Sequence, residues 1–270
     1  MIDGGCKSKA QIIDEVVNVS SATLNPRLEL HNPDGNVTAC ANELPTQLSW
    51  RHPMLMLHGS ATSNYYNKVK LALLEKEVMF TEVYAATHST DEVILGASPL
   101  GKIPFITTEN GALCESQPML EWIEDSWPQP PLLPADAFAA AKVRELTTFI
   151  DWHLEIEARH LYGNAFFGAP PVLESDATRI RTQLVNNIAA IRHLARFSPF
   201  IAGDSFTQAD CAAFSHFPLV ALATKIVLGE DLLAAGGIDH KAYTRFIAER
   251  PSARKVLADR KVALAHAGWS

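Results

Sequence analysis

The sequence predicts an α/β domain followed by an all-α domain. Short apolar strands and amphipathic helices alternate in the order β-α-β-α-β-β-α between residues 54 and 127. Four prolines then fall within residues 128–134, a segment that cannot continue a helix. Beyond it, long runs with apolar residues at helical spacing continue through the chain. These three observations predict a mixed-sheet domain over 54–130 and a helical bundle over 135–270.

Composition limits the classes of protein that the chain can belong to. Of its 270 residues, 47% are hydrophobic and 20% are charged, as in ordinary globular proteins. The net charge of -7 and the lack of a basic run argue against a nucleic-acid surface. We expect no membrane span, and the N-terminus lacks the long apolar core of a signal peptide. The four scattered cysteines form no CxxC pair, which favours a reducing cytoplasm and no disulfide framework.

Residues 1–53 differ in composition from the rest of the chain. They are rich in Asn, Ser, Asp and Gly, and they hold one short apolar stretch at 12–19. Such a segment cannot build a core. We expect a loosely ordered N-terminal extension rather than a functional segment.

The elements of the α/β domain follow one another closely. An apolar strand, a polar loop, an amphipathic helix, a second strand and a short helical turn are predicted at 54–58, 59–63, 64–76, 80–84 and 91–95. A right-handed crossover makes the first two strands parallel.

A β-hairpin and a helix complete this domain. The hairpin begins at Pro104, turns at 109–111 and leads into a helix at 116–127. Because proline cannot donate a ladder hydrogen bond, it belongs at the start of a strand, where a cis Ile103–Pro104 bond is favoured. A cis bond would turn the Ile103 backbone away from the sheet, so that it can pair with an extended peptide ligand.

Glu115 and Ser116 lie where the second hairpin strand gives way to a helix. A carboxylate, a hydroxyl and free helix N–H groups therefore converge there. Glu115 suits an ammonium group, while Ser116 and the helix N-terminus suit a carboxylate. Together they predict a binding site for the head group of an amino acid.

The second half of the chain is predicted to be entirely helical. Helices are expected at 135–162, 174–195, 207–228, 242–249 and 252–265. Thr207 suits the N-cap of the third, which is largely apolar, and Asp210 three positions later suits the reciprocal role of a capping box.

Taken together, residues 54–266 resemble the cytosolic glutathione transferases, which join a thioredoxin-like domain to an all-α bundle. The resemblance rests on the Pro104 hairpin with Glu115-Ser116 and on the Thr207–Asp210 box. It implies that Pro104 is cis, that Ile103 pairs with the cysteinyl backbone of glutathione, and that Glu115 and Ser116 hold its γ-glutamyl end. Lys102, and less favourably His88, are candidates for attracting the glycyl carboxylate.

The loop at 59–69 resembles that of theta- and zeta-like bacterial relatives, with a serine before Lys68-Val69. The resemblance places the catalytic hydroxyl on Ser63, with Thr62 and Asn64 as alternatives. A free thiol has a pKa of about 8.5, so a hydroxyl donor and a helix N-terminus are needed to make thiolate the main species. The family's usual tyrosine is replaced by His58, and the loop has no cysteine.

The resemblance implies a glutathione S-transferase that activates the glutathione thiol for attack on small apolar electrophiles. It also implies a cytoplasmic, homodimeric detoxification enzyme that uses glutathione as co-substrate and no metal. The alternatives are a glutathione-dependent disulfide reductase and a non-enzymatic glutathione- or ligand-binding protein; a maleylacetoacetate-type isomerase is disfavoured because the loop lacks Ser-Ser-Cys. The candidate residues for the wall of the electrophile pocket are Trp152, His153, Arg159, Tyr162, Phe166 and Phe167.

Overall fold

A mixed sheet of four strands organises the first part of the computed structural model, which describes residues 55–268. The strands are β1 (Met56–Gly59), β2 (Thr81–Tyr84), β3 (Phe105–Thr108) and β4 (Gly111–Cys114), in the spatial order β2-β1-β3-β4. β1 is parallel to β2 and antiparallel to β3, and β4 is antiparallel to β3. This is the predicted thioredoxin-like arrangement. The prediction for residues 1–53 lies outside the described residues.

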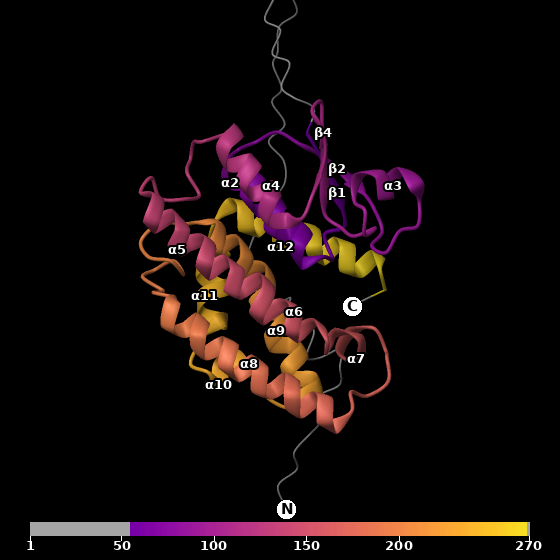
Figure 1. Ribbon diagram of the computed structural model, residues 1–270, viewed down its shortest axis with the longest axis vertical. Coiled ribbons are helices and arrows are strands. Elements are labelled where there is room, and N and C mark those ends of the chain that lie inside the picture. Colours follow the sequence, from indigo (N-terminus) through magenta and orange to yellow (C-terminus); the bar gives the residue numbers. More distant parts are fainter. Residues whose placement is uncertain (1–54, 269–270) are drawn as a thin grey trace, which may run out of the picture. The chain divides into compact units, whose positions relative to one another are not determined.

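Three helices accompany the sheet: α2 (Asn64–Glu75), α3 (Glu92–Ala97) and α4 (Ser116–Ser126). α2 and α4 pack against each other (Figure 1). The hairpin is closed by a two-residue turn, because Thr108 pairs with Gly111 across it. Gly111 has φ 116°, a backbone conformation that residues with a side chain rarely adopt.

Helices make up the rest of the described chain (Figure 1). They are α5 (Ala137–Thr148), the π-helix η1 (Phe149–Glu155), α6 (Ile156–Arg159), α7 (Tyr162–Phe166), α8 (Glu174–Leu194), α9 (Gln208–Leu228), α10 (Leu232–Ala235), α11 (His240–Ile247) and α12 (Pro251–His266). The predicted long helices are present, and α7 and α10 are additional short ones.

The prediction of one helix over 135–162 is wrong in two respects. Within it, the N–H of Ile156 bonds to the carbonyl of Asp151, five residues earlier, which widens the helix into the π segment. The helix then ends at Arg159, where the N–H of His160 bonds to the carbonyl three residues back and tightens the last turn. The helical spacing of apolar residues predicts neither the π segment nor the end of the helix at Arg159.

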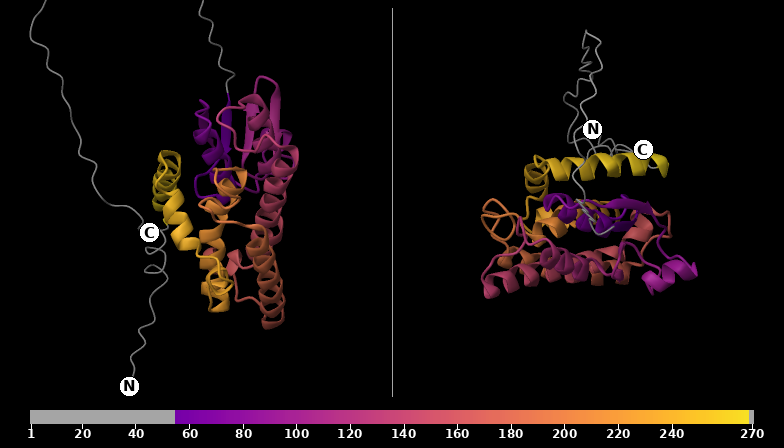
Figure 2. Two further views of the ribbon diagram at one scale, coloured as in Figure 1. Left: turned by 90° about the vertical axis from the view of Figure 1, so that its left-hand side faces the viewer. Right: turned by 90° about the horizontal axis from the view of Figure 1, so that it is seen from above.

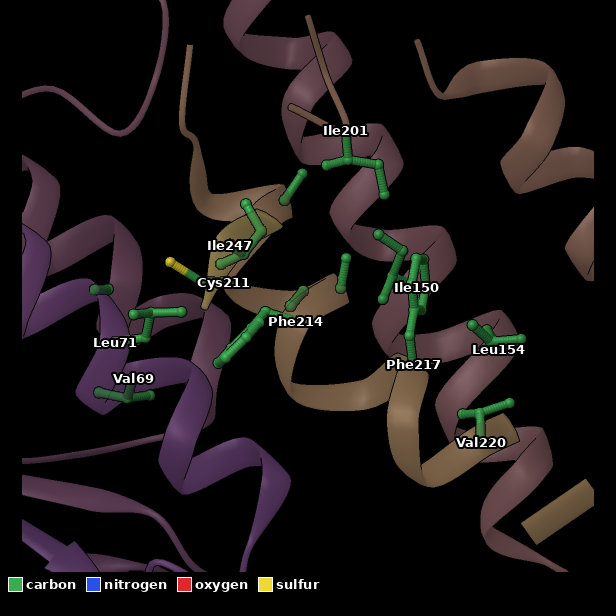
Figure 3. Close-up of a cluster of buried hydrophobic side chains, with 14 of the residues drawn as sticks. Val69, Leu71, Ile150, Leu154, Ile201, Cys211, Phe214, Phe217, Val220 and Ile247 are labelled. Carbon is green, nitrogen blue, oxygen red and sulfur yellow. The ribbon is translucent and has the colours of Figure 1, made fainter. Parts of the chain in front are cut away.

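The core lies where α9 passes between α2 and the helices α5 and η1. Figure 3 shows side chains from these elements meeting around Phe214 and Phe217 of α9. Both are buried, as are Val69 and Leu71 of α2 and Ile150 and Leu154 of η1. Burying one such side chain contributes about 1.5–3 kcal/mol, so this packing joins the sheet part to the helices.

The N-terminus of α9 carries the predicted capping box. Thr207 is the N-cap, and both reciprocal hydrogen bonds with Asp210 are present. The Asp210 carboxylate also accepts hydrogen bonds from the Ile201 N–H at 2.9 Å and the Tyr243 hydroxyl at 2.6 Å. By length and composition α9 could span a membrane, but 61% of its apolar window is buried, as in the core helix of a soluble protein.

α12 lies along the outer side of α2 (Figure 2, right). Asp259 of α12 accepts from Lys70 of α2 at 2.5 Å and from Lys255 of its own helix at 2.8 Å. Lys70 also pairs with Glu82 of β2 at 2.7 Å. These ion pairs fix the position of α12 against the α/β part.

Candidate functional site

The peptide bond between Ile103 and Pro104 is cis, as predicted. Pro104 is buried at the start of β3, and no described residue hydrogen-bonds to the backbone N–H or C=O of Ile103. The loop before it is tied down, because Gly101 (φ 61°) accepts from the Ser89 N–H at 3.1 Å. A Cβ atom at Gly101 would lie 2.3 Å from the Ser89 carbonyl oxygen, so this approach requires glycine.

The register of the sheet places Ile103, the β1–α2 loop and the β4–α4 junction at one edge of the sheet. His58 pairs with Phe105, and Phe105 pairs with Cys114. Continuing both ladders past the strand ends places Ile103 beside the β1–α2 loop on one side and beside the β4–α4 junction on the other. A Cβ built on Gly59 would lie 3.4 Å from the Cβ of Ile103, which confirms that this loop and Ile103 are neighbours.

Glu115 and Ser116 occupy the junction between β4 and α4, as predicted. Glu115 is exposed and has φ 69° and ψ 122°, and its side chain does not cap the helix. A non-glycine residue in that conformation costs about 1–3 kcal/mol, and such residues cluster at ligand-binding sites. Ser116 is buried, with its hydroxyl 3.2 Å from the ammonium of Lys68. The junction therefore presents a carboxylate that no described residue pairs with, beside a hydroxyl and the first N–H groups of α4.

Ser63 is the N-cap of α2, with extended backbone angles of φ -80° and ψ 128°. Its hydroxyl oxygen accepts a hydrogen bond from the Tyr66 N–H at 3.3 Å. Because a hydroxyl can accept and donate at once, its own proton stays available. The Thr62 hydroxyl, by contrast, lies 3.0 Å from that of Ser60, with which it shares a hydrogen bond.

The amide of Asn64 is held in a buried network. Its nitrogen donates to Glu155 at 2.7 Å and to Nδ1 of His216 at 2.8 Å, and its oxygen accepts from Arg159 at 3.3 Å. Both amide donors and one acceptor position are thereby used. Of the three predicted candidates, Asn64 has both amide hydrogens bonded and Thr62 shares a hydrogen bond with Ser60, whereas the Ser63 hydroxyl accepts from Tyr66 and has no described acceptor for its own proton.

A buried ion pair lies beneath this edge of the sheet. The ammonium of Lys68 in α2 contacts the carboxylate of Asp151 in η1, and both side chains are buried. Lys68 also donates to the Gln117 side chain at 3.0 Å. The other carboxylate oxygen of Asp151 lies 3.1 Å from Nε2 of His216, which must carry the proton because Nδ1 accepts from Asn64.

The neighbours of Asp151 stabilise its carboxyl in the charged form. Burial alone raises the pKa of its carboxyl, but the Lys68 ammonium and the His216 ring more than offset this and hold the pKa below its usual value. Because the same Lys68 ammonium touches Ser116, the ion pair fixes the distance between α2 and the N-terminus of α4.

Lys102 and His88 are exposed, and neither side chain forms a hydrogen bond or an ion pair with another described residue. His88 has φ 58°, in the left-handed region. Both candidates lie on loops that border the cis bond.

The candidates for the electrophile pocket divide into two groups. The Arg159 guanidinium lies over the rings of Tyr65 and Tyr162, at 5.3 and 5.5 Å from their centroids. Trp152 is 63% exposed, and the ring of His153 packs with Phe149, 4.7 Å away. Arg159 thus joins Asn64 to Tyr162, whose ring packs with that of Phe166 at 5.1 Å. Trp152, His153 and Phe167 are exposed.

Asp151, His216 and the role of Lys68 were missed by sequence reasoning. A signal was present for one of them, because His216 lies within the largely apolar run of the buried helix α9. Residues 55–268 contain no group of three or more His, Cys, Asp or Glu side chains placed to hold a metal ion.

Residues 57–131 match the family model described as glutathione S-transferase, N-terminal domain. A glutathione S-transferase of Pseudomonas putida is 38% identical over 213 residues, covering 78% of this chain and 94% of that protein. A stringent starvation protein A homolog of Pasteurella multocida is 25% identical over 77% of this chain and 92% of its own.

A solved structure shows the same fold. It is a glutathione S-transferase of Methylobacterium radiotolerans in complex with glutathione sulfonate, with a TM-score of 0.61 at 23% identity. The match covers 76% of this chain and 94% of that one.

Proposed function

Because this chain belongs to the glutathione S-transferase family, we propose that it binds glutathione at the Ile103–Ser116 edge and activates its thiol through Ser63. The single observation that supports this role for Ser63 is its unshared hydroxyl proton at the N-terminus of α2. The chain is of the serine type of the family, in the theta- and zeta-like branch.

Glutathione is held by groups that match its two ends. The unpaired backbone of Ile103 suits the cysteinyl N–H and C=O, which would lie as an added strand beside β3. The Glu115 carboxylate suits the γ-glutamyl ammonium, and the Ser116 hydroxyl with the first N–H groups of α4 suits its carboxylate. Lys102, adjacent to Ile103, is the proposed partner of the glycyl carboxylate.

Thiolate stabilisation is then the main catalytic effect. A hydroxyl that donates to sulfur, together with the positive end of α2, lowers the thiol pKa by about 1–2 units, at about 1.4 kcal/mol per unit. The thiolate attacks an electrophilic carbon: a C–S bond forms, the leaving group departs with its electron pair, and the thiol proton goes to solvent. Proximity of the two bound reactants supplies the rest of the acceleration.

Titration of bound glutathione by thiolate absorbance near 240 nm tests the proposal. In the wild type the thiol pKa should fall below its free value of about 8.5, and Ser63→Ala should reverse this fall. Ser63→Thr keeps a hydroxyl and should restore part of it. Ser126→Ala, the same kind of change on an exposed serine at the end of α4, is the matched control.

Two other outcomes of this titration would assign a different role to Ser63. A lowered pKa that survives Ser63→Ala but is lost in Thr62→Val would move the role to Thr62. Binding with an unchanged thiol pKa would indicate a glutathione-binding protein without transferase chemistry.

The proposal includes a cytoplasmic homodimer that acts in detoxification, on the basis of family membership. Sedimentation equilibrium of the full chain checks the dimer. A monomer that still binds glutathione would contradict the proposed dimer but not the proposed glutathione binding.

A further inference from the structure

Asn67 of α2 is a buried asparagine with an unpaired acceptor. It is 3% exposed, and its amide nitrogen donates to the Ala61 carbonyl at 2.8 Å, but its amide oxygen has no hydrogen-bond partner. The other buried asparagines of the described chain, Asn64 and Asn187, have partners for both amide atoms. Asn67 is therefore an exception among them.

Stability alone does not favour asparagine at this position. Asn67 lies inside α2 on a side that is packed away from water, where leucine, with the same branched shape, forms helices more readily. Leucine would also leave no acceptor of its own buried without a partner, which is a costly arrangement. Departures from such local rules are expected where a residue serves a site, so we looked to the one bond that the Asn67 amide makes.

That bond holds the β1–α2 loop to the helix that follows it. Residues 60–62 otherwise bond within the loop: the Thr62 hydroxyl and N–H contact the Ser60 hydroxyl, and the Ser63 N–H donates to the Ser60 carbonyl at 2.9 Å. Within residues 55–268, no hydrogen bond other than that of Asn67 links residues 60–62 to a residue of α2. Without the Asn67 amide, the loop would lose this link.

Asn67 also fixes the backbone on both sides of Ser63. Its own N–H donates to the Ser63 carbonyl at 3.1 Å, in the first turn of the helix, while its side chain holds the carbonyl of Ala61, two residues earlier. The Ser63 hydroxyl oxygen is placed in addition by the Tyr66 N–H at 3.3 Å. These contacts together set the direction in which the Ser63 hydroxyl can donate its proton.

We propose that Asn67 is a positioning residue for thiol activation: by holding the Ala61 carbonyl, it fixes the β1–α2 loop in the conformation in which the Ser63 hydroxyl meets the sulfur of glutathione. This inference rests on the proposed function and adds to it a residue that acts through another. The strength of a hydrogen bond depends steeply on its angle, so a loop that can shift would lose part of the lowering of the thiol pKa.

The thiolate absorbance of bound glutathione, followed against pH, tests the inference. Asn67→Leu removes the amide donor and keeps the branched shape of the side chain. It should raise the pKa of the bound thiol by about 0.5–1 unit, which lowers the thiolate fraction about 3- to 10-fold at pH values below that pKa. Glutathione affinity at about pH 5.5, where the thiol is protonated both free and bound, should stay within about two-fold of the wild type.

Two further variants separate positioning from a structural role. Asn67→Ala cannot overpack the site and should raise the thiol pKa by a similar amount. Asn187→Leu is the matched control, because it removes a buried amide that donates to the His153 carbonyl in η1. It should lower the urea midpoint of unfolding and leave the thiol pKa unchanged.

The outcomes separate this inference from the proposed function. An unchanged thiol pKa in both Asn67 variants, with the expected rise in Ser63→Ala, would overturn the inference and leave the proposed function intact. An equal rise in Asn187→Leu, or the loss of folding in both Asn67 variants, would also overturn it, because Asn67 would then serve the fold rather than the loop. If the wild-type thiol pKa is not lowered, the proposed function fails and the inference fails with it.

Discussion

Asp151 and Asp210 are both buried, but the pKa values of their carboxyls are shifted in opposite directions. Asp151 beneath the candidate site faces Lys68 and His216, and its carboxyl pKa lies below the usual value because these partners outweigh burial. Asp210 at the start of α9 accepts only from neutral donors, and burial raises its pKa despite those hydrogen bonds.

The difference teaches that burial does not set the state of a carboxyl by itself. A charged neighbour makes Asp151 part of an electrostatic arrangement that reaches Ser116, at the site. Neutral donors make Asp210 a structural anchor that joins Ile201, Thr207 and Tyr243. Substitution at the first should affect glutathione binding, and substitution at the second should affect folding alone.

The largest effect is expected for Asp210→Ala. It leaves the buried Tyr243 hydroxyl and the N–H groups of Ile201 and Thr207 without acceptors, so the free energy of unfolding should fall by about 3–5 kcal/mol. Urea unfolding measures this. Asp204→Ala, at an exposed position, is the control and should cost less than about 0.5 kcal/mol. If Asp210→Ala lowers the free energy of unfolding by less than about 1 kcal/mol, Asp210 is not a structural anchor.

The next effect concerns the ion pair. Lys68→Met or Asp151→Leu alone should each cost about 3 kcal/mol, because each leaves one buried charge unpaired. The double variant should be more stable than either single one, since both charges are gone. Glutathione affinity should nevertheless stay reduced in the double variant, because Ser116 has lost its ammonium neighbour. Additive stability losses in the double-mutant cycle would contradict this.

A smaller, pH-dependent effect separates the two aspartates directly. Asp210 has a folded pKa above its usual 3.8, so protonation adds stability below that value, and this stability is lost as pH rises through the folded pKa. Asp151 has a folded pKa below 3.8, so its contribution is present above 3.8 and is lost only as pH falls through the lower value.

The stability deficit of Asp210→Asn relative to wild type should therefore grow between pH 7 and pH 4, since asparagine cannot take up the proton. The deficit of Asp151→Asn should stay level over the same range. Unfolding curves at several pH values measure both. Parallel pH profiles for the two variants would show that the aspartates do not differ.

The smallest effect on stability is expected at Thr207, the N-cap of α9. Thr207→Ala removes one side-chain hydrogen bond at the start of α9 and should cost about 1 kcal/mol. Glutathione affinity should be unchanged, as calorimetry can check. A change in affinity would mean that the anchor and the site are coupled.

Local patterns were enough to predict the elements that depend on local chemistry. The hairpin at Pro104, the cis bond before it and the Thr207–Asp210 capping box each depend on residues a few positions apart, and all are present. The parallel pairing of the first two strands followed from the crossover between them. The assignment of Ser63 and the glutathione-binding residues remains a prediction.

Contacts between distant segments could not be read from the sequence. Lys68 and Asp151 are separated by 83 positions, and Asn64 and His216 by 152. Asn64 was a candidate for thiol activation because it follows Ser63, yet its amide is used inside the protein. The π segment was also not predicted, because apolar residues at helical spacing do not distinguish a π turn from an α turn.

The π-helix makes the protein sensitive to the number of codons in one short stretch of its gene. The wide turn presents the Asp151 carbonyl to both the Ile156 N–H and the Tyr65 hydroxyl, while Glu155 reaches Asn64. Deleting any one of residues 152–154 would restore ordinary α spacing and rotate the Asp151 and Glu155 side chains relative to each other. Such a deletion would keep the helix and its composition, but would detach it from α2 at one end or the other.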